Sequence, residues 1–166
     1  MEMNILFVAI AALVPLVIGF VWYGPLFGNA WMNEMGFTKE SMEGRNMTLI
    51  FILCLVFSFI LAFILQTLVI HQWGVYSSLM GEPGFADGVA GEATIFFTNY
   101  METYGDRFRT FKHGALHGAI LGLFLVLPVL SIIAMFEKKS VRYVAINAGY
   151  WVVTLAIMAG IICQWV

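Results

Sequence analysis

Three histidines are the residues of this chain whose type and spacing could carry chemistry. His113 and His117 lie one helical turn apart, so their imidazoles share one face of a helix. Such a pair can hold a metal ion or haem, or transfer a proton, with His71, Glu102 or Asp106 as candidate further ligands of a metal ion. The interpretation that the sequence favours is structural, in which the imidazoles hydrogen-bond to loop carbonyls or tyrosines.

Sequence motifs of the common enzyme classes are missing. The metalloprotease pattern His-Glu-x-x-His fails because Gly114 follows His113, and neither Gly-x-Ser-x-Gly nor a phosphate-binding glycine loop occurs. The formal net charge is −2 and the eight Lys and Arg form no basic stripe, which excludes nucleic acid as a partner. The sequence therefore predicts no catalytic residue and favours a non-enzymatic role, with metal or haem as the only candidate cofactors.

The elements that position these histidines are apolar helices. The 166 residues are 61% hydrophobic and 11% charged, whereas a soluble domain is about 25% charged. Four apolar runs are long enough to cross a bilayer as helices, at residues 5–23, 48–70, 114–136 and 141–165. The sequence predicts an all-α membrane protein, a single domain over residues 1–166 built as a four-transmembrane-helix bundle in contact with membrane lipids.

The loop between the second and third runs has two parts. Residues 74–91 are rich in glycine and predict irregular chain. Apolar residues then recur at steps of three and four, at Phe97, Tyr100, Met101, Tyr104, Phe108 and Phe111. This stripe predicts an amphipathic interfacial helix that leads into the third span, with a bend at Gly105.

Glycine recurs at every fourth residue of the third run, at Gly114, Gly118 and Gly122. This spacing removes side chains from one helix face and predicts a close crossing with another helix, nearest at Gly118. The partner helix belongs either to the same chain or to a second copy, so a homo-oligomer is one of two open alternatives.

Polar side chains within the predicted spans need partners. Asn147, Tyr150 and Trp151 form the best candidate cluster for a small pocket, and Gln66 is a further candidate. Hydrogen bonding between helices is the favoured role of these groups, and a path for a small solute is the alternative.

The distribution of basic residues predicts the orientation. With four spans, both termini and the long loop share one side, which carries Arg107, Arg109 and Lys112. The opposite side has shorter segments with Lys39, Arg45, Lys138, Lys139 and Arg142. The positive-inside rule therefore predicts that both termini and the long loop lie outside.

The end of the first run carries an unusual motif, Trp22-Tyr23-Gly24-Pro25, followed by Trp31. Trp22 and Tyr23 are expected as interfacial anchors, and Gly24-Pro25 is expected to end the helix. With the stretches 113–122, 136–139 and 146–151, this motif resembles the bacterial membrane family catalogued as domain of unknown function 1761. The resemblance covers the first and last thirds of the chain and implies a small multi-pass protein of the bacterial inner membrane, with no activity attached.

Three hypotheses about function follow. The first is a self-associating helix bundle that binds or passes a small solute, whose identity the sequence does not give. The second is a non-catalytic membrane interaction or assembly factor, with the aromatic stripe between residues 97 and 111 as its docking surface. The third is a metal- or haem-binding membrane enzyme that uses His113 and His117.

Overall fold

The computed structural model describes residues 3–38 and 44–166, and this part of the chain is helical without strands. The all-α fold class is therefore confirmed. Lys39, which the orientation prediction counts, lies outside the described residues. The α-helices of the described part are α1 (Ile5–Val21), α2 (Gly28–Met35), α3 (Met47–Val69), α4 (His71–Leu79), α5 (Glu92–Tyr104), α6 (Phe111–Leu121), α7 (Leu127–Phe136) and α8 (Val141–Trp165).

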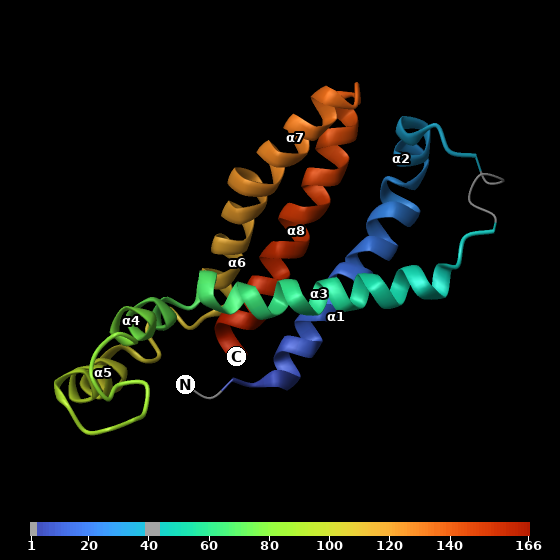
Figure 1. The fold of residues 1–166 in the computed structure, drawn as a ribbon. Helices are drawn as coiled ribbons and strands as arrows, with labels where there is room; N and C mark the ends of the chain where they lie inside the picture. The colour runs from blue at the N-terminus through green and yellow to red at the C-terminus, as the bar shows by residue number, and fades with distance from the viewer. Residues whose placement is uncertain (1–2, 39–43) are drawn as a thin grey trace.

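Four helical stretches are long and apolar enough to cross a membrane, as the sequence predicted. They run over Ile5–Leu26, Met47–Val69, Phe111–Phe136 and Val141–Trp165. The third stretch combines α6 and α7 and begins three residues before the predicted boundary, so His113 and His117 both lie in its first two turns. Figure 1 shows α6, α7 and α8 as one tilted layer, with α1 and α3 crossing beside it.

The motif Trp22-Tyr23-Gly24-Pro25 does not end the first span, which corrects the sequence prediction. The chain continues as a π-helical turn, Trp22–Leu26, and α2 begins at Gly28. A wider π turn accommodates the proline because its hydrogen bonds skip one residue more than those of an α-helix. A second π-helical turn, Gly122–Val126, joins α6 to α7 and ends two residues before Pro128, a residue type at which helices commonly kink.

Helix α8 is the centre of the bundle. In its most apolar window 56% of the residues are buried within the protein, against 11% for the span formed by α6 and α7. The buried side chains along α8 include Thr154, Leu155, Met158 and Ile162. The remaining apolar surface of the other three spans faces outward, as expected where lipid takes the place of a protein interior.

The glycine face of α6 packs against α8 of the same chain. A Cβ atom added at Gly118 would lie 2.1 Å from the carbonyl oxygen of Leu155, and one at Gly114 would lie 2.2 Å from that of Ala159. Because backbone meets backbone at these points, only glycine fits. The predicted close crossing at Gly118 is present, and its partner is a helix within the chain.

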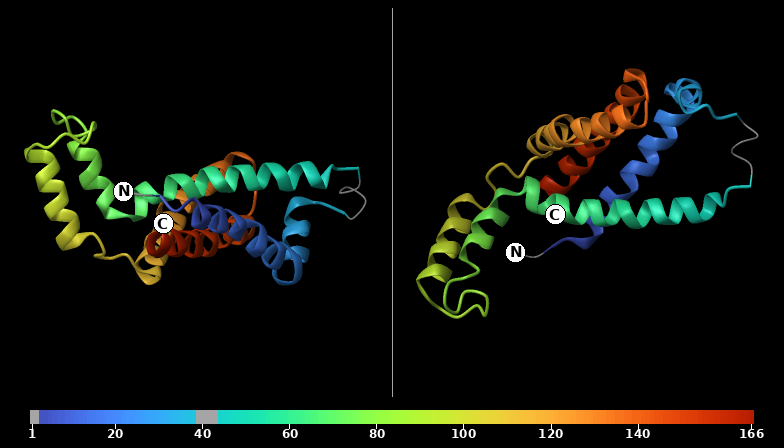
Figure 2. Two further views of the ribbon diagram at one scale, coloured as in Figure 1. Left: turned by 90° about the horizontal axis from the view of Figure 1, so that it is seen from below. Right: turned by 45° about the horizontal axis from the view of Figure 1, so that its top comes forward.

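Helices α4 and α5 form a hairpin that projects from the end of the bundle where α3 ends and α6 begins (Figures 1 and 2). The sequence predicted a helix in this loop but missed α4, which includes Gly74 and extends into the segment expected to be irregular. Aromatic contacts join the two helices: the ring of Tyr76 lies 5.6 Å from that of Phe97. Helix α5 ends at Tyr104, so Phe108 and Phe111 do not continue its stripe.

Candidate functional site

The three histidines meet at the end of the bundle that carries the α4–α5 hairpin. His71 is the first residue of α4, two residues beyond the end of α3, and His113 and His117 lie in the first two turns of α6. His71 is exposed and the other two are half-buried. The two segments are separated by 42 positions in sequence, so the contact depends on how the hairpin returns the chain to α6.

The imidazole rings lie close enough for their nitrogens to share one ligand. Nε2 of His71 lies 2.9 Å from Nε2 of His113, a hydrogen-bonding distance if one ring carries the proton. Ring centroids are 4.5 Å apart for His113 and His117 and 5.1 Å apart for His71 and His117. One ligand nitrogen from each histidine can be chosen so that all three lie within 4.8 Å of one another.

Phe108 covers one side of the histidine cluster. Its ring stacks on His113 with centroids 4.9 Å apart and meets His71 edge-on at 6.0 Å. The backbone of Phe108 has φ +65°, a left-handed conformation that costs energy for a residue with a large side chain. This backbone conformation places the apolar ring of Phe108 against the imidazoles of His113 and His71. A cavity of about 300 Å³ beside His71 is lined by Phe108, Gln72, Tyr100, Tyr104 and Arg107.

Gln72 ties the beginning of α4 to the turn that leads into α6. Its side chain is 1% exposed, and its Nε2 donates to the carbonyl oxygens of Tyr104, Gly105 and Arg107 at 2.8–3.1 Å. These three acceptors fix which end of the amide is nitrogen, because an amide oxygen there would face three carbonyls. Gln72 therefore positions His71, its neighbour in sequence, against the turn that carries Phe108.

The first turn of α6 is held by the end of α8. The Thr110 hydroxyl caps α6 by accepting from the backbone N–H of His113 at 3.3 Å. The N–H of Phe111 donates to Oε1 of Gln164 at 2.9 Å, and Nε of Arg109 donates to the carbonyl of Cys163 at 2.7 Å. Together with the glycine contacts, these bonds fix His113 and His117 relative to α8.

The candidate pocket residues of the spans are divided between the two ends of the bundle. Asn147 and Tyr150 lie near the beginning of α8, and Trp151 contacts Tyr150 with ring centroids 5.1 Å apart. Gln66 lies near the end of α3, where it lines a cavity together with Gln164 from the end of α8. The structure therefore brings Asn147, Tyr150 and Trp151 together but places Gln66 elsewhere.

Asn147 and Tyr150 are hydrogen-bonded to the conspicuous motif at the end of the first span. Tyr23 donates its hydroxyl to Oδ1 of Asn147 at 2.9 Å, and Trp22 donates Nε1 to the carbonyl of Ile146 at 3.0 Å. The Tyr150 hydroxyl donates to the carbonyl of Pro15 at 2.9 Å. The motif thus joins α1 to α8. Trp31 packs edge-on against Tyr23, with centroids 5.5 Å apart.

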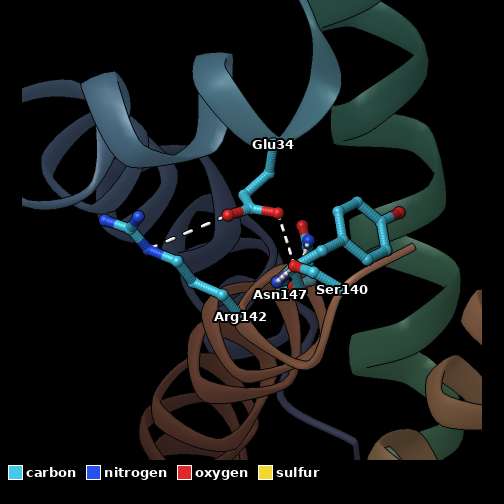
Figure 3. A network of polar contacts seen from close by, with 5 residues as sticks. Glu34, Ser140, Arg142 and Asn147 are labelled. Carbon is cyan, nitrogen blue, oxygen red and sulfur yellow. Dashed lines mark hydrogen bonds and ion pairs between the residues drawn. The ribbon is translucent and has the colours of Figure 1, made fainter.

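A short polar chain extends this end of the bundle toward α2 (Figure 3). Glu34 accepts a hydrogen bond from the hydroxyl of Ser140 and lies 3.9 Å from Nε of Arg142. The amide nitrogen of Asn147 donates to the carbonyl of Tyr143 at 2.8 Å. These groups all have protein partners, so the arrangement fixes α2 against the beginning of α8.

Two residues of the histidine site were missed from the sequence. Gln72 had no distinguishing pattern, since it follows His71 at the end of an apolar run. Phe108 was assigned to the α5 stripe, although a turn separates it from that helix. The spacing of His113 and His117 is the sequence signal that places two of the three histidines on one face of a helix.

The family model described as "Protein of unknown function (DUF1761)" matches residues 6–163 of the chain. The match includes all three histidines and runs across the middle of the chain, which the sequence resemblance left uncovered. Comparison with curated proteins and with solved structures finds no match.

Proposed function

We propose that this chain, which belongs to the DUF1761 family of proteins of unknown function, binds a divalent transition-metal ion through His71, His113 and His117. The observation that carries the proposal is that the three histidines can offer ligand nitrogens within 4.8 Å of one another. Within residues 3–38 and 44–166 this is the one group of three or more potential metal ligands with such spacing.

The geometry suits an ion of the zinc class. Zinc binds histidine nitrogen at about 2.0–2.1 Å, which places two ligands of a tetrahedral ion roughly 3.3–3.4 Å apart. One separation in the cluster is 2.9 Å, and the chosen ligand nitrogens all lie within 4.8 Å of one another, so the histidines are close to the spacing that a tetrahedral ion requires. Three imidazoles would leave a fourth position for water or an added ligand.

The same geometry argues against haem as the ligand. His113 and His117 lie on one face of α6, and the three ring centroids are only 4.5–5.1 Å apart. A porphyrin held between two of them would need a far larger gap. We therefore assign the site to a bare ion.

Hydrogen bonding alone explains the cluster less well than an ion does. A single Nε2···Nε2 contact can satisfy His71 and His113, but the ring of His117 has no hydrogen-bond partner among the described residues. An ion would join all three rings in one set of bonds. Gln72 and Phe108 support this interpretation because they hold two of the ligand segments in place before any ion binds.

A solute pocket at Asn147 ranks below the metal site. The side chains of Asn147 and Tyr150 are engaged by α1 and by the backbone of α8, which leaves them little capacity for a ligand. No contact in the structure distinguishes a docking role for the aromatic stripe of α5.

The test is metal content and metal titration of the purified protein, without a polyhistidine tag because such a tag binds the same ions. Wild-type protein in detergent is expected to take up one Zn²⁺ per chain, and Co²⁺ in its place should give the visible absorption of a tetrahedral site. The His113→Ala variant should lose both signals.

The matched control is Cys54→Ser, which removes an exposed thiol that could itself bind zinc. Its zinc uptake should equal that of wild type. Absence of uptake by wild type at micromolar free zinc, or equal uptake by His113→Ala, would contradict the proposal.

A further inference from the structure

A larger cavity lies at the same end of the bundle and is independent of the histidines. Its volume is about 520 Å³, within the range of small-molecule sites. It lies between the end of α3, the turn before α6 and the end of α8. Its polar lining comes from Gln66, Asp106, Arg109 and Gln164, and its apolar lining includes Ile70, Trp73 and Met101.

Two opposite charges on its wall do not pair with each other. Asp106 and Arg109 are three residues apart in one turn, yet their side chains form no ion pair. Nε of Arg109 donates to the carbonyl of Cys163, which orients the guanidinium. Among the described residues, neither its Nη atoms nor the carboxylate of Asp106 have a hydrogen-bond partner.

The two glutamines contribute one acceptor and one donor. Gln66 is 2% exposed, and its Nε2 donates to the carbonyl of Phe63 at 3.1 Å and to Sδ of Met3 at 3.2 Å. Its Oε1 accepts no hydrogen bond within the described part of the chain. Oε1 of Gln164 accepts from the N–H of Phe111, so its Nε2 remains as a donor.

We infer that this cavity binds a zwitterionic group, in which a cationic amine lies next to a carboxylate or phosphate. The amine is matched by the Asp106 carboxylate and by Oε1 of Gln66. The anionic part is matched by the Arg109 guanidinium, a fork of donors suited to planar or tetrahedral oxyanions, and by Nε2 of Gln164. A zwitterion would pair with both charged side chains at once, whereas a simple anion or a simple cation would pair with only one of them.

Two sources can supply this chemistry. One is a free amino acid or a related small zwitterion. The other is the headgroup of an ethanolamine phospholipid, which carries an ammonium and a phosphate. Trp73 and the neighbouring apolar residues suit either source, because both bring a short carbon chain alongside the charges.

The experiment measures binding to delipidated protein in dodecyl maltoside, a detergent with an uncharged sugar headgroup. Calorimetric titrations with glycine and with glycerophosphoethanolamine represent the two sources, and acetate and methylamine are the single-charge comparisons. EDTA is present throughout, so that glycine cannot bind through a metal ion at the histidines. At least one zwitterion is expected to bind 10-fold or more tightly than both single-charge probes.

Binding of glycine identifies a free solute, and binding of glycerophosphoethanolamine alone identifies a lipid headgroup. The Asp106→Asn variant, which keeps the side-chain shape, should weaken that binding at least 10-fold. Glu102→Gln is the matched control, because it removes a carboxylate from a neighbouring position that does not line this cavity, and it should bind as wild type does.

Three results would overturn the inference. The first is that neither zwitterion binds. The second is that acetate or methylamine binds as tightly as the zwitterions. The third is that Asp106→Asn binds as wild type does. Circular dichroism and gel filtration of each variant establish that it is folded.

Discussion

The two ends of the bundle differ in whether their polar side chains have hydrogen-bond partners within the described part of the protein. At the end formed by α2 and the beginning of α8, the side chains of Trp22, Tyr23 and Asn147 all donate or accept hydrogen bonds within the protein. At the other end, the ring of His117 and the carboxylate of Asp106 have no hydrogen-bond partner among the described residues. The buried Oε1 of Gln72 also lacks one.

This difference distinguishes polar groups that hold the helices together from polar groups that are available to a ligand. Buried polar groups are almost always hydrogen-bonded, so a network that is closed within the protein holds helices together and needs no ligand. Groups that stay unpaired at a fixed position are the ones that a ligand can satisfy. We therefore call the first region the closed end, formed by Trp22, Tyr23, Glu34 and Asn147. The second is the open end, formed by His71, His113, His117 and the larger cavity.

The largest effect should come from removing a ligand at the open end. Loss of an outer hydrogen-bond partner of a metal ligand typically costs 10–100-fold in affinity, and loss of the ligand itself should cost more. His71→Ala is expected to weaken zinc binding by more than about 100-fold, or about 2.8 kcal/mol. Competition with a chromophoric chelator measures this change. An affinity within threefold of wild type would remove His71 from the site.

The next effect should come from the helix pair that connects the two ends. Gly118→Ala places a methyl group where the carbonyl oxygen of Leu155 lies, so α6 and α8 must separate. We expect the free energy of unfolding to fall by about 1–3 kcal/mol, measured by SDS titration in mixed micelles. Gly74→Ala is the control, since nothing lies within 4 Å of the added methyl there and the variant should match wild type or exceed it.

A smaller effect is expected from opening the closed end. Tyr23→Phe removes the donor to Asn147, and hydrogen bonds between membrane helices contribute about 0.6 kcal/mol on average and up to about 1.7 kcal/mol. Stability should fall by about 1 kcal/mol, while zinc affinity should stay as in wild type. Tyr100→Phe, whose hydroxyl has no partner in the described structure, should change neither. If Tyr23→Phe altered zinc affinity instead, the division into two independent ends would be wrong.

The smallest effect should come from the edge of the closed end. Arg142 is 64% exposed and its Nε lies 3.9 Å from Glu34, a geometry in which an ion pair contributes little. Arg142→Gln should lower the free energy of unfolding by less than about 0.5 kcal/mol. The difference should shrink further at 1 M salt. A loss above 1 kcal/mol would show that Glu34 anchors α2 more firmly than the geometry indicates.

Much of the fold could be predicted because its causes are local. The length of the apolar runs predicted the four spans, and the occurrence of glycine at every fourth residue, at Gly114, Gly118 and Gly122, predicted the close crossing. The repeat could not identify the partner, since glycine marks only one of the two surfaces in contact. Helix α4 was missed because it contains Gly74 and several polar residues, and because it lacks the marked apolar face by which a helix is predicted from sequence.

The sites were harder to predict because they depend on distant contacts. The pairing of His113 with His117 follows from helix periodicity, but the distance from His71 depends on the turn before α6. That turn is held by the side chain of Gln72, which donates to three backbone carbonyl oxygens. No sequence pattern predicts these three hydrogen bonds. The larger cavity likewise joins residues from α3, the turn and α8, so Gln66 lies beside Gln164 and not beside Asn147 as the predicted pocket would require.

The contact between His71 and His113 has a consequence for the hairpin that separates them. An ion bound to both would close the chain between them, a sequence separation of 42 positions, into a ring. Closing a flexible loop of this length costs roughly 3 kcal/mol of chain entropy beyond a constant term. The hydrogen bonds of Gln72 hold the same two ends of the hairpin near each other. The bound ion would therefore cross-link the two ends of the α4–α5 hairpin. Variants that weaken binding of the ion should also make α4 and α5 more susceptible to proteolysis.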